Sequence, residues 1–255
     1  MGGDIPMKLG RHEIGPHRTF IIAEAGTNFA GDTEYRRETN IGKYIQNAER
    51  VGVDAIKFQI FYPNEPLFCP IDGDETRWTR WNQTLLPLKT WRQAKVFSEQ
   101  CGLVFLASAF QPAAVQWLKE LGVEAYKVAS RARDTYPYDS VPGPFIVSCR
   151  PPSVFQGAGD ALVDEAWPIQ CTPQYPTPWS MDALWNGMGH GLSDHTGNIW
   201  AGLHAITHGA SMLEVHFSIH DDKRDAGNDA LVCLTTAQLK FLAEARDAFA
   251  SLRSD

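Results

Sequence analysis

Residues 191–197 read GLSDHTG, so a serine, an aspartate and a histidine follow one another at the end of an apolar segment. Taken alone, Ser193, Asp194 and His195 are also consistent with a helix cap followed by a surface histidine. A second histidine, His216, lies near the end of the next apolar segment, LEVHFS. Two neutral imidazoles on adjacent strand ends are typical ligands of one divalent cation, with water or substrate oxygens completing the shell. The pattern suggests that His195 and His216 bind a metal, that Ser193 contacts a phosphate, and that Asp194 orients the site or caps the helix.

Other apolar segments of the chain also end in polar side chains. A single lysine, serine or histidine in such a place is ordinarily a surface residue, a cap or a hydrogen-bonded core residue. Two lysines inside buried strands are costly unless an anion meets them, because an unpaired buried ammonium loses its hydration. Together the lysines and hydroxyls predict a cage for a phosphate and a carboxylate. The polar residues at segment ends are Glu24, Lys57, Gln59, Ser108, Lys127, Ser130, Ser148, Thr172, Tyr175 and Glu214.

These side chains need a framework that brings segment ends together. Apolar segments rich in β-forming residues alternate with segments of helical period, which is typical of βα units on a parallel sheet. The predicted strands are Thr19–Ala25, Ala55–Phe61, Val104–Ser108, Ala125–Ala129, Phe145–Ser148, Pro168–Thr172, His190–Ser193 and Met212–Phe217. The predicted helices include Ile41–Val51, Leu88–Cys101, Pro112–Leu121, Ile199–His208 and Thr236–Leu252. The proline-rich and aromatic stretch Tyr62–Pro87 is expected to form a lid or an active-site loop.

Eight strands with helices between them in 255 residues predict an α/β fold, a (β/α)8 TIM barrel that forms a single domain over residues 1–255. An open doubly wound sheet is the alternative. It is weakened by the lack of a G-x-G-x-x-G or G-x-x-x-x-G-K-[ST] loop, although neither loop is obligatory. In a barrel the carboxyl ends of the strands form the active face, so the polar residues are predicted to meet there.

Composition excludes several classes of partner. The formal net charge is −7 and no run of lysine or arginine occurs, so nucleic acid is not an expected partner. Five cysteines without a C-x-x-C pair indicate neither a zinc ribbon nor a disulfide framework. No apolar run reaches membrane-spanning length and no secretory signal is evident, so we expect a cytoplasmic protein without a membrane partner.

The sequence resembles the N-acetylneuraminate (sialic acid) synthase family over nearly its whole length. The segments that carry the resemblance share their order and spacing with the family: FIIAEAGTNFAGD, VDAIKFQIF, VFLASAF, LKELGVEAYKVAS, QCTPQYPTP, GLSDHTG, GASMLEVHFSIH and GNDALVCLT. The resemblance implies a (β/α)8 barrel and a transferase reaction of carbohydrate biosynthesis. In that reaction the methylene carbon of phosphoenolpyruvate attacks a sugar aldehyde, water adds at C2, and phosphate leaves. The product is a sialic acid-like 2-keto-3-deoxy acid.

The resemblance also implies roles for individual residues. His195 and His216 match metal ligands for Mn2+ or Mg2+, which polarises the aldehyde oxygen as a Lewis acid. Lys57 and Lys127 match the lysines that hold phosphoenolpyruvate. The hydroxyls that match its phosphate and carboxylate contacts are those of Ser108, Ser130, Ser148 and Ser193.

Four further residues match positions around the reacting atoms and the sugar. Glu24 matches a carboxylate that stabilises an oxocarbenium-like centre or relays a proton from the attacking water. Tyr175 and Gln59 match substrate-positioning residues. Asp229 of GND resembles the aspartate of the family's G-P-D segment, which is expected near the sugar.

Departures from the family pattern fall mainly on the acceptor side. Where the family has N-H-N-G, this chain has Asn28-Phe29-Ala30-Gly31. Val215 replaces the lysine of the family's E-K-H-F, and Ser148-Cys149-Arg150-Pro151 stands in place of S-T-G-M. After YKVAS the chain continues with Arg131-Ala132-Arg133, and two extra arginines favour a more anionic acceptor or replace an arginine from elsewhere.

That second possibility concerns the family's C-terminal antifreeze-like domain, which lends an arginine to the neighbouring subunit. The chain ends at Asp255, directly after the last predicted helix. We therefore expect either a separately encoded antifreeze-like domain or a single-domain relative with a different acceptor. The resemblance implies a homodimer, and barrel enzymes of this kind commonly form dimers.

Two other functions are compatible with the same residues. One is a metal-dependent barrel lyase or hydrolase acting on a phosphorylated or acidic sugar, which would turn over without consuming phosphoenolpyruvate. The other is a non-catalytic relative that binds a sugar phosphate or a partner protein.

Overall fold

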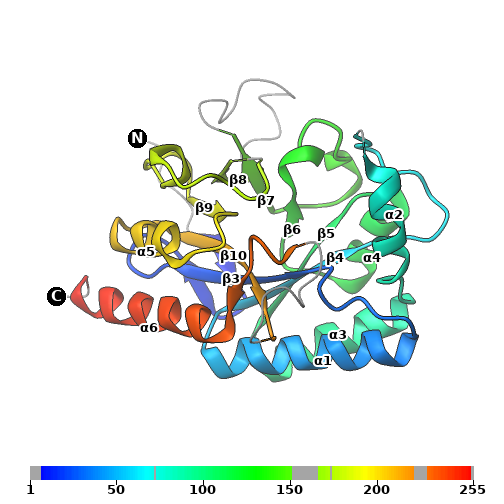
Figure 1. Cartoon of the computed structure of the whole chain (residues 1–255), viewed down its shortest axis with the longest axis horizontal. Coiled ribbons are helices and arrows are strands. Elements are labelled where there is room, and N and C mark those ends of the chain that lie inside the picture. The colour runs from blue at the N-terminus through cyan, green and yellow to red at the C-terminus, as the bar shows by residue number, and fades with distance from the viewer. Residues whose placement is uncertain (1–6, 72, 151–165, 173, 221–228, 254–255) are drawn as a thin grey trace.

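The computed structural model describes residues 7–71, 73–150, 166–172, 174–220 and 229–253 (Figure 1). Eight parallel strands follow one another in the hydrogen-bonded order β5-β4-β3-β10-β9-β8-β7-β6, and β5 and β6 approach each other to complete a nearly closed barrel. The strands are β3 (Phe20–Gly26), β4 (Ala55–Ile60), β5 (Val104–Ala109), β6 (Tyr126–Val128), β7 (Phe145–Cys149), β8 (Ala166–Cys171), β9 (Gly191–Asp194) and β10 (Met212–Ser218). The predicted barrel class and all eight predicted strands are confirmed, with strand ends that differ by at most two residues. The assignment of residues 1–255 to one domain stays a prediction.

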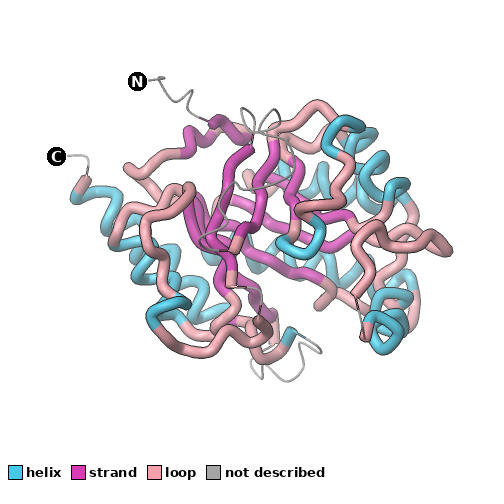
Figure 2. The backbone as a smooth tube through the Cα atoms, turned by 90° about the horizontal axis from the view of Figure 1, so that it is seen from above, coloured by secondary structure: helices cyan, strands magenta, loops and turns pink. Residues whose placement is uncertain are grey.

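Helices lie outside the strands, as Figure 2 shows in the view from above. They are α1 (Glu34–Val51), α2 (Asp74–Asn82), α3 (Leu88–Gln100), α4 (Pro112–Leu121), α5 (Ile199–Thr207) and α6 (Thr236–Leu252). The predicted bounds of α4 and α6 are confirmed, and α6 begins with a capping box formed by Thr235 and Gln238. By contrast, α1 begins at Glu34 rather than Ile41, because the Thr33 hydroxyl accepts a hydrogen bond from the Arg36 amide and starts the helix earlier. None of the described helices is both long enough and apolar enough to cross a membrane.

The alternation of strand and helix is incomplete on one side of the barrel. Between β6 and β7 the chain forms only the 3-10 helices η1 (Ser130–Ala132) and η2 (Tyr138–Ser140). Between β8 and β9 the described residues form only the 3-10 helix η4 (Met181–Ala183). Both connections are rich in proline and glycine, which remove backbone donors or disfavour a helical interior.

A two-stranded antiparallel hairpin, β1 (Met7–Leu9) and β2 (His12–Ile14), precedes the barrel and was not among the predicted elements. Its apolar side chains Met7, Leu9 and Ile14 pack in one cluster with inward-facing barrel residues such as Phe20 and Leu106. The hairpin therefore closes the end of the barrel where the strands begin.

The inner wall of the barrel changes from apolar to polar along each strand. The apolar cluster near the strand starts includes Ile22, Ala55, Leu106, Ala125, Ile146, Ile169 and Met212. Side chains on a strand alternate between its two faces, so the residue two positions later points to the same interior. Those next inward residues are Glu24, Lys57, Ser108, Lys127, Ser148, Cys171 and Glu214, and all of them line one cavity.

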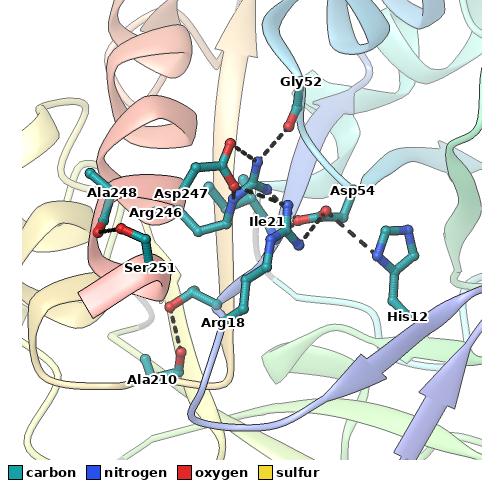
Figure 3. A network of polar contacts seen from close by, with 11 residues as sticks. His12, Arg18, Ile21, Gly52, Asp54, Ala210, Arg246, Asp247, Ala248 and Ser251 are labelled. Atoms are coloured by element: carbon teal, nitrogen blue, oxygen red, sulfur yellow. Dashed lines mark hydrogen bonds and ion pairs between the residues drawn. The ribbon is translucent and has the colours of Figure 1, made fainter. Parts of the chain in front are cut away.

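A polar network fixes the opposite end of the barrel (Figure 3). Asp54 accepts hydrogen bonds from Arg246 Nη1 at 2.5 Å, from Arg18 Nη1 at 2.8 Å and from the Ile21 amide at 2.8 Å. Arg246 Nη2 also donates to the Gly52 carbonyl at 2.7 Å. The guanidinium of Arg246 and the carboxylate of Asp54 are both buried, so the last helix is tied to the starts of β3 and β4.

Candidate active site

A cavity of about 710 Å³ opens at the carboxyl ends of the barrel strands. The twelve residues to which the sequence assigned catalysis, substrate binding or metal binding all line it: Glu24, Lys57, Gln59, Ser108, Lys127, Ser130, Ser148, Tyr175, Ser193, His195, His216 and Asp229. Thr172, another predicted segment-end residue, is not among the lining residues. Asp194 does not line it. Its carboxylate instead accepts from the amide of Thr196 at 2.8 Å and from the Thr196 hydroxyl at 3.2 Å, which closes a local turn. Of its two predicted roles, capping of the helix belongs instead to Asn198, whose side chain accepts from the Trp200 amide at 2.9 Å at the start of α5.

Two buried lysines form the floor of the cavity. Lys57 Nζ lies 2.6 Å from Glu24 Oε2 and donates to Ser108 Oγ at 3.2 Å. Lys127 Nζ donates to Ser148 Oγ at 2.7 Å. Each ammonium therefore already has a hydroxyl partner from the neighbouring strand, which holds it in position to meet an anion.

Glu214 joins the two lysines and is the residue to which sequence reasoning assigned no role. Its carboxylate lies 3.8 Å from Lys57 Nζ and 3.6 Å from Lys127 Nζ, and it accepts from Ser193 Oγ at 2.8 Å. The signal was present in the sequence, because Glu214 stands two positions before His216 on the same strand face and two buried lysines require a counter-ion.

Burial shifts the pKa values of the two carboxylates and two lysines of this floor toward the neutral forms, and the neighbouring charges set the final direction of each shift. Burial raises the pKa of Glu24 to about 7, although Lys57 opposes the shift. Burial would also raise the pKa of Glu214, but Lys127 and Lys57 outweigh it and hold that pKa at about 2. Burial lowers the pKa of Lys127, whereas Glu214 and Glu24 overcome burial and raise the pKa of Lys57. The permanently ionised carboxylate of the floor is therefore Glu214, and Glu24 is poised to exchange a proton near neutral pH.

The two histidines lie together on one wall. Their ring centroids are 5.4 Å apart, and burial lowers the pKa of His195 to about 4 and that of His216 well below its ordinary value. Both rings are therefore neutral at pH 7, the protonation state that binds a metal. The Tyr175 hydroxyl lies 2.9 Å from His216 Nε2, and the sulfur of Cys171 lies 3.7 Å from His195 Nδ1.

The donor set near His216 fits a divalent cation that keeps other ligands. His216 Nδ1 and Asp229 Oδ2 are buried, lie 3.9 Å apart and make no hydrogen bond with the described residues. Oε1 of Glu24 is likewise buried without such a bond. Within the described ranges no three His, Cys, Asp or Glu side chains converge as a complete metal site. Water or substrate oxygens would therefore have to complete the shell of a bound metal.

Gly26 gives these groups room to gather. Its φ of +56° is in the left-handed region, and a Cβ there would come within 2.9 Å of Asp229 Oδ2 and 3.3 Å of Glu24 Oε1. Any larger residue would push the two carboxylates apart, so glycine at this position keeps Glu24, Asp229 and His216 in one compartment.

The mouth of the cavity is formed partly by α2, which lies within the predicted loop Tyr62–Pro87. Arg77, Arg80 and Trp81 of this helix line the cavity. The Trp81 ring stacks on Phe61 with centroids 4.9 Å apart, and Phe61 stacks on Phe110 at 5.5 Å. Sequence reasoning missed the two arginines, although their i,i+3 spacing puts them on one helix face once α2 is recognised.

The extra arginines that the sequence pointed to are held by carboxylates. Arg131 lines the cavity, but its guanidinium pairs with Asp74 through contacts of 3.1 and 2.6 Å and also donates to the Cys69 carbonyl. Arg133 pairs with Asp134 at 2.8 Å and is not among the residues that line the cavity. The arginines of α2, Arg77 and Arg80, are therefore better candidates for binding an anion than Arg131 and Arg133.

The chain is similar to sugar-acid synthases. N,N'-diacetyllegionaminic acid synthase of Campylobacter jejuni is 28% identical over 255 residues, which cover 88% of this chain and 74% of that protein. The N-acetylneuraminate-9-phosphate synthase of Homo sapiens is 27% identical over 271 residues, covering 92% of this chain and 72% of that protein.

Solved structures agree on the fold. An N-acetylneuraminic acid (sialic acid) synthetase from Leptospira borgpetersenii, crystallised with citrate, superposes with a TM-score of 0.75 at 22% identity and covers 98% of this chain and 90% of its own. The sequence model of the NeuB family matches residues 44–139 and 161–254. Because these segments make up most of the barrel, the chain belongs to the NeuB family.

Proposed function

We propose that this protein is a synthase that condenses phosphoenolpyruvate with a sugar aldehyde and releases phosphate. The observation that carries the proposal is the floor of the cavity, where Lys57 and Lys127 stand beside serine hydroxyls and next to two neutral imidazoles. Phosphoenolpyruvate carries a phosphate and a carboxylate on three carbons, and two ammonium groups with hydroxyl partners match those two anions.

Each part of the floor has a task in binding the donor. Lys57 and Lys127 neutralise the two anionic groups, and the hydroxyls of Ser108, Ser148 and Ser193 accept or donate the hydrogen bonds that fix its orientation. Ser130 lines the same cavity beyond the end of β6. The ionised Glu214 keeps both lysines charged and aimed at the cavity, which makes it a positioning residue.

The reaction forms one carbon–carbon bond and one carbon–oxygen bond, and it breaks the carbon–oxygen bond to phosphate. C3 of phosphoenolpyruvate bonds to the aldehyde carbon, whose oxygen becomes a hydroxyl. Water adds to C2, and the C2–O bond to phosphate breaks, giving a 2-keto-3-deoxy sugar acid. Glu24, with its raised pKa, takes the proton from the attacking water or stabilises the positive charge at C2.

His195 and His216 would hold the divalent metal, Mn2+ or Mg2+, and that metal when bound polarises the aldehyde oxygen as a Lewis acid. Burial keeps both imidazoles neutral for this purpose. The hydroxyl of Tyr175 contacts His216 and fixes its ring. Asp229 and Gln59 line the cavity and are proposed to position the sugar.

The relatives support the class of reaction. N,N'-diacetyllegionaminic acid synthase, N-acetylneuraminate-9-phosphate synthase and pseudaminic acid synthase of Campylobacter jejuni are all named for making a sugar acid. At 25–28% identity these names support a sugar-acid synthase and leave the acceptor of this chain open.

The decisive experiment is phosphate release from phosphoenolpyruvate in the presence of Mn2+, with a panel of neutral, phosphorylated and acidic sugar aldehydes. Release is expected only when donor, acceptor and metal are all present, and chelation should abolish it. Metal-dependent turnover of a sugar without consumption of phosphoenolpyruvate would instead identify a lyase or hydrolase. If no sugar is turned over and a sugar phosphate raises the melting temperature, the protein is a binding relative.

A further inference from the structure

Helix α2 places two arginines at the mouth of the cavity, above the floor that accounts for phosphoenolpyruvate. Arg77 and Arg80 are three residues apart on the helix and both line the cavity. The side chain of Arg77 is 48% exposed, whereas those of Lys57 and Lys127 are 5% and 1% exposed. The cations of this site therefore occupy two levels, a buried pair at the floor and an arginine pair nearer to solvent.

The helix that carries the arginines is firmly attached to the barrel. Asp74, the first residue of α2, is buried and pairs with Arg131 in a two-pronged contact. Burial would raise the pKa of Asp74, but hydrogen bonds from Arg131 lower it below its ordinary value, so the carboxylate stays charged. Near the other end of the helix, Trp81 is buried against Phe61 at the end of β4. Two anchors hold α2 so that its arginines are preorganised.

The internal partners of the cations also differ between the two levels. At the floor, Lys57 contacts both Glu24 and Glu214, and Lys127 contacts Glu214. At the mouth, Arg77 Nη1 makes a long contact of 3.4 Å with Asp74 Oδ1, an oxygen that Arg131 already contacts at 3.1 Å.

Arg80 is also engaged by the chain, through a donation from Nη2 to the Thr27 carbonyl at 3.2 Å. A guanidinium carries five N–H donors in a fixed fork, so a side chain that lines the cavity can hold a chain carbonyl and a ligand anion at the same time. The formal net charge of the chain is −7, so the positive charge of Arg77 and Arg80 is local to the mouth of the cavity and is not part of a generally basic surface.

Building on the function proposed above, we infer that Arg77 and Arg80 bind an anionic group of the acceptor, at the end of the sugar away from its aldehyde. The acceptor is then a phosphorylated or carboxylated sugar rather than a neutral one. The aldehyde must reach the histidine wall and the donor at the floor, so the far end of the sugar extends toward the mouth. A cavity of about 710 Å³ has room for both substrates. The stacked rings of Trp81 and Phe61 form an apolar wall beside the path of the sugar.

The test compares three acceptors that differ only at C6: an N-acetylated hexosamine, its 6-phosphate and the corresponding hexuronic acid. Phosphate release from phosphoenolpyruvate is measured for the wild-type protein, for Arg77→Gln and Arg80→Gln, and for Arg92→Gln. Arg92 is a matched control because it lies on α3, is 57% exposed and pairs with Glu120 far from the lining residues.

We expect the wild-type kcat/KM to be at least about tenfold higher for an anionic acceptor than for the neutral sugar. Each glutamine variant on α2 should lose most of that preference through a higher KM for the acceptor, while its KM for phosphoenolpyruvate stays unchanged. The control should behave as wild type. Comparing the phosphate with the carboxylate then shows which anion the arginines select.

Calorimetric titration of the hexosamine 6-phosphate provides a readout that needs no turnover. Its Kd should be about tenfold weaker in Arg77→Gln and Arg80→Gln than in the wild type and in Arg92→Gln. If phosphate is released equally well with the neutral sugar, the inference about the acceptor is wrong while the synthase function stands. If no acceptor supports phosphate release, the proposed synthase function is wrong, but the titration still tests the anion site. Equal Kd values in the wild type, Arg77→Gln, Arg80→Gln and Arg92→Gln would show that the two arginines of α2 do not bind the phosphate.

Discussion

Nζ of Lys57 lies 2.6 Å from Oε2 of Glu24, and both side chains are buried at the carboxyl ends of adjacent strands. The strand register pairs these two residues directly, so their contact is built into the sheet. A bound anion must share Lys57 with Glu24. The pair therefore links donor binding to the protonation of Glu24.

The first prediction concerns pH. Because burial raises the pKa of Glu24 to about 7, its ionised fraction grows as pH rises from 6 to 8, and kcat should grow with it if Glu24 acts as a base. Glu24→Gln should lower kcat by about 10²–10⁴-fold and remove the rise near pH 7. Steady-state phosphate release across this pH range is the measurement. The exposed Glu120→Gln is the control, and a Glu24→Gln variant with normal kcat would rule out the catalytic role.

The raised pKa of Glu24 also makes the free energy of unfolding depend on pH. A carboxyl group whose pKa is raised on folding favours the folded state most below its unfolded pKa near 4.5, and this contribution is lost as pH rises through about 7. The free energy of unfolding, measured with urea at pH 5 and at pH 8, should therefore differ less between the two pH values in Glu24→Gln than in the control Glu120→Gln. The control keeps the contributions of the other titrating groups, and an equal difference in both variants would contradict the raised pKa of Glu24.

A second prediction concerns the donor. Lys127→Met keeps the length of the side chain but removes a charged hydrogen bond, whose net contribution is about 1.5–3 kcal/mol. The KM for phosphoenolpyruvate should rise about 10–100-fold. Lys89→Met, on the exposed surface of α3, should leave it unchanged. An unaltered KM in Lys127→Met would place the donor elsewhere in the cavity.

Metal binding gives a third prediction. His195→Gln and His216→Gln should each lose stoichiometric Mn2+ binding in calorimetry and lose phosphate release with it, because the described residues offer no complete set of replacement ligands. His208→Gln, a change at an exposed histidine of the neighbouring helix end, should keep both properties. Full metal content and full activity in both variants would show that the two imidazoles serve another purpose.

A fourth prediction concerns the other end of the barrel. Arg246→Met removes the buried partner of Asp54 and should lower the free energy of unfolding by about 3 kcal/mol, because a buried carboxylate loses a direct ion pair. Asp247→Asn changes a carboxylate that is 59% exposed and should cost less than about 1 kcal/mol. Urea denaturation measures both, and similar values for the two variants would contradict a structural role for the Asp54–Arg246 pair.

Local sequence patterns were enough to place the floor of the cavity. The two-residue period of a strand determines that Lys57 follows Ala55 to the interior and that Lys127 follows Ala125, and parallel strands bring their carboxyl ends to one face. Strand ends supplied most of the twelve candidate residues without coordinates, the family resemblance supplied Asp229, and the catalytic roles of all of them remain predictions. The strands were equally accessible, because their apolar runs are bounded by turn residues.

What the sequence could not decide are the contacts between segments that lie far apart in the chain. Nothing near Arg131 in the sequence shows that Asp74 takes up its guanidinium, or that Arg77 and Arg80 stand at the mouth instead. Glu214 was visible as a polar residue near a strand end, but its partners Lys57, Lys127 and Ser193 come from three other strands. Periodicity reports which face a side chain is on, because that is a property of the local backbone. Which charge meets which is set by the closure of the barrel and the docking of α2, and only the tertiary structure contains that information.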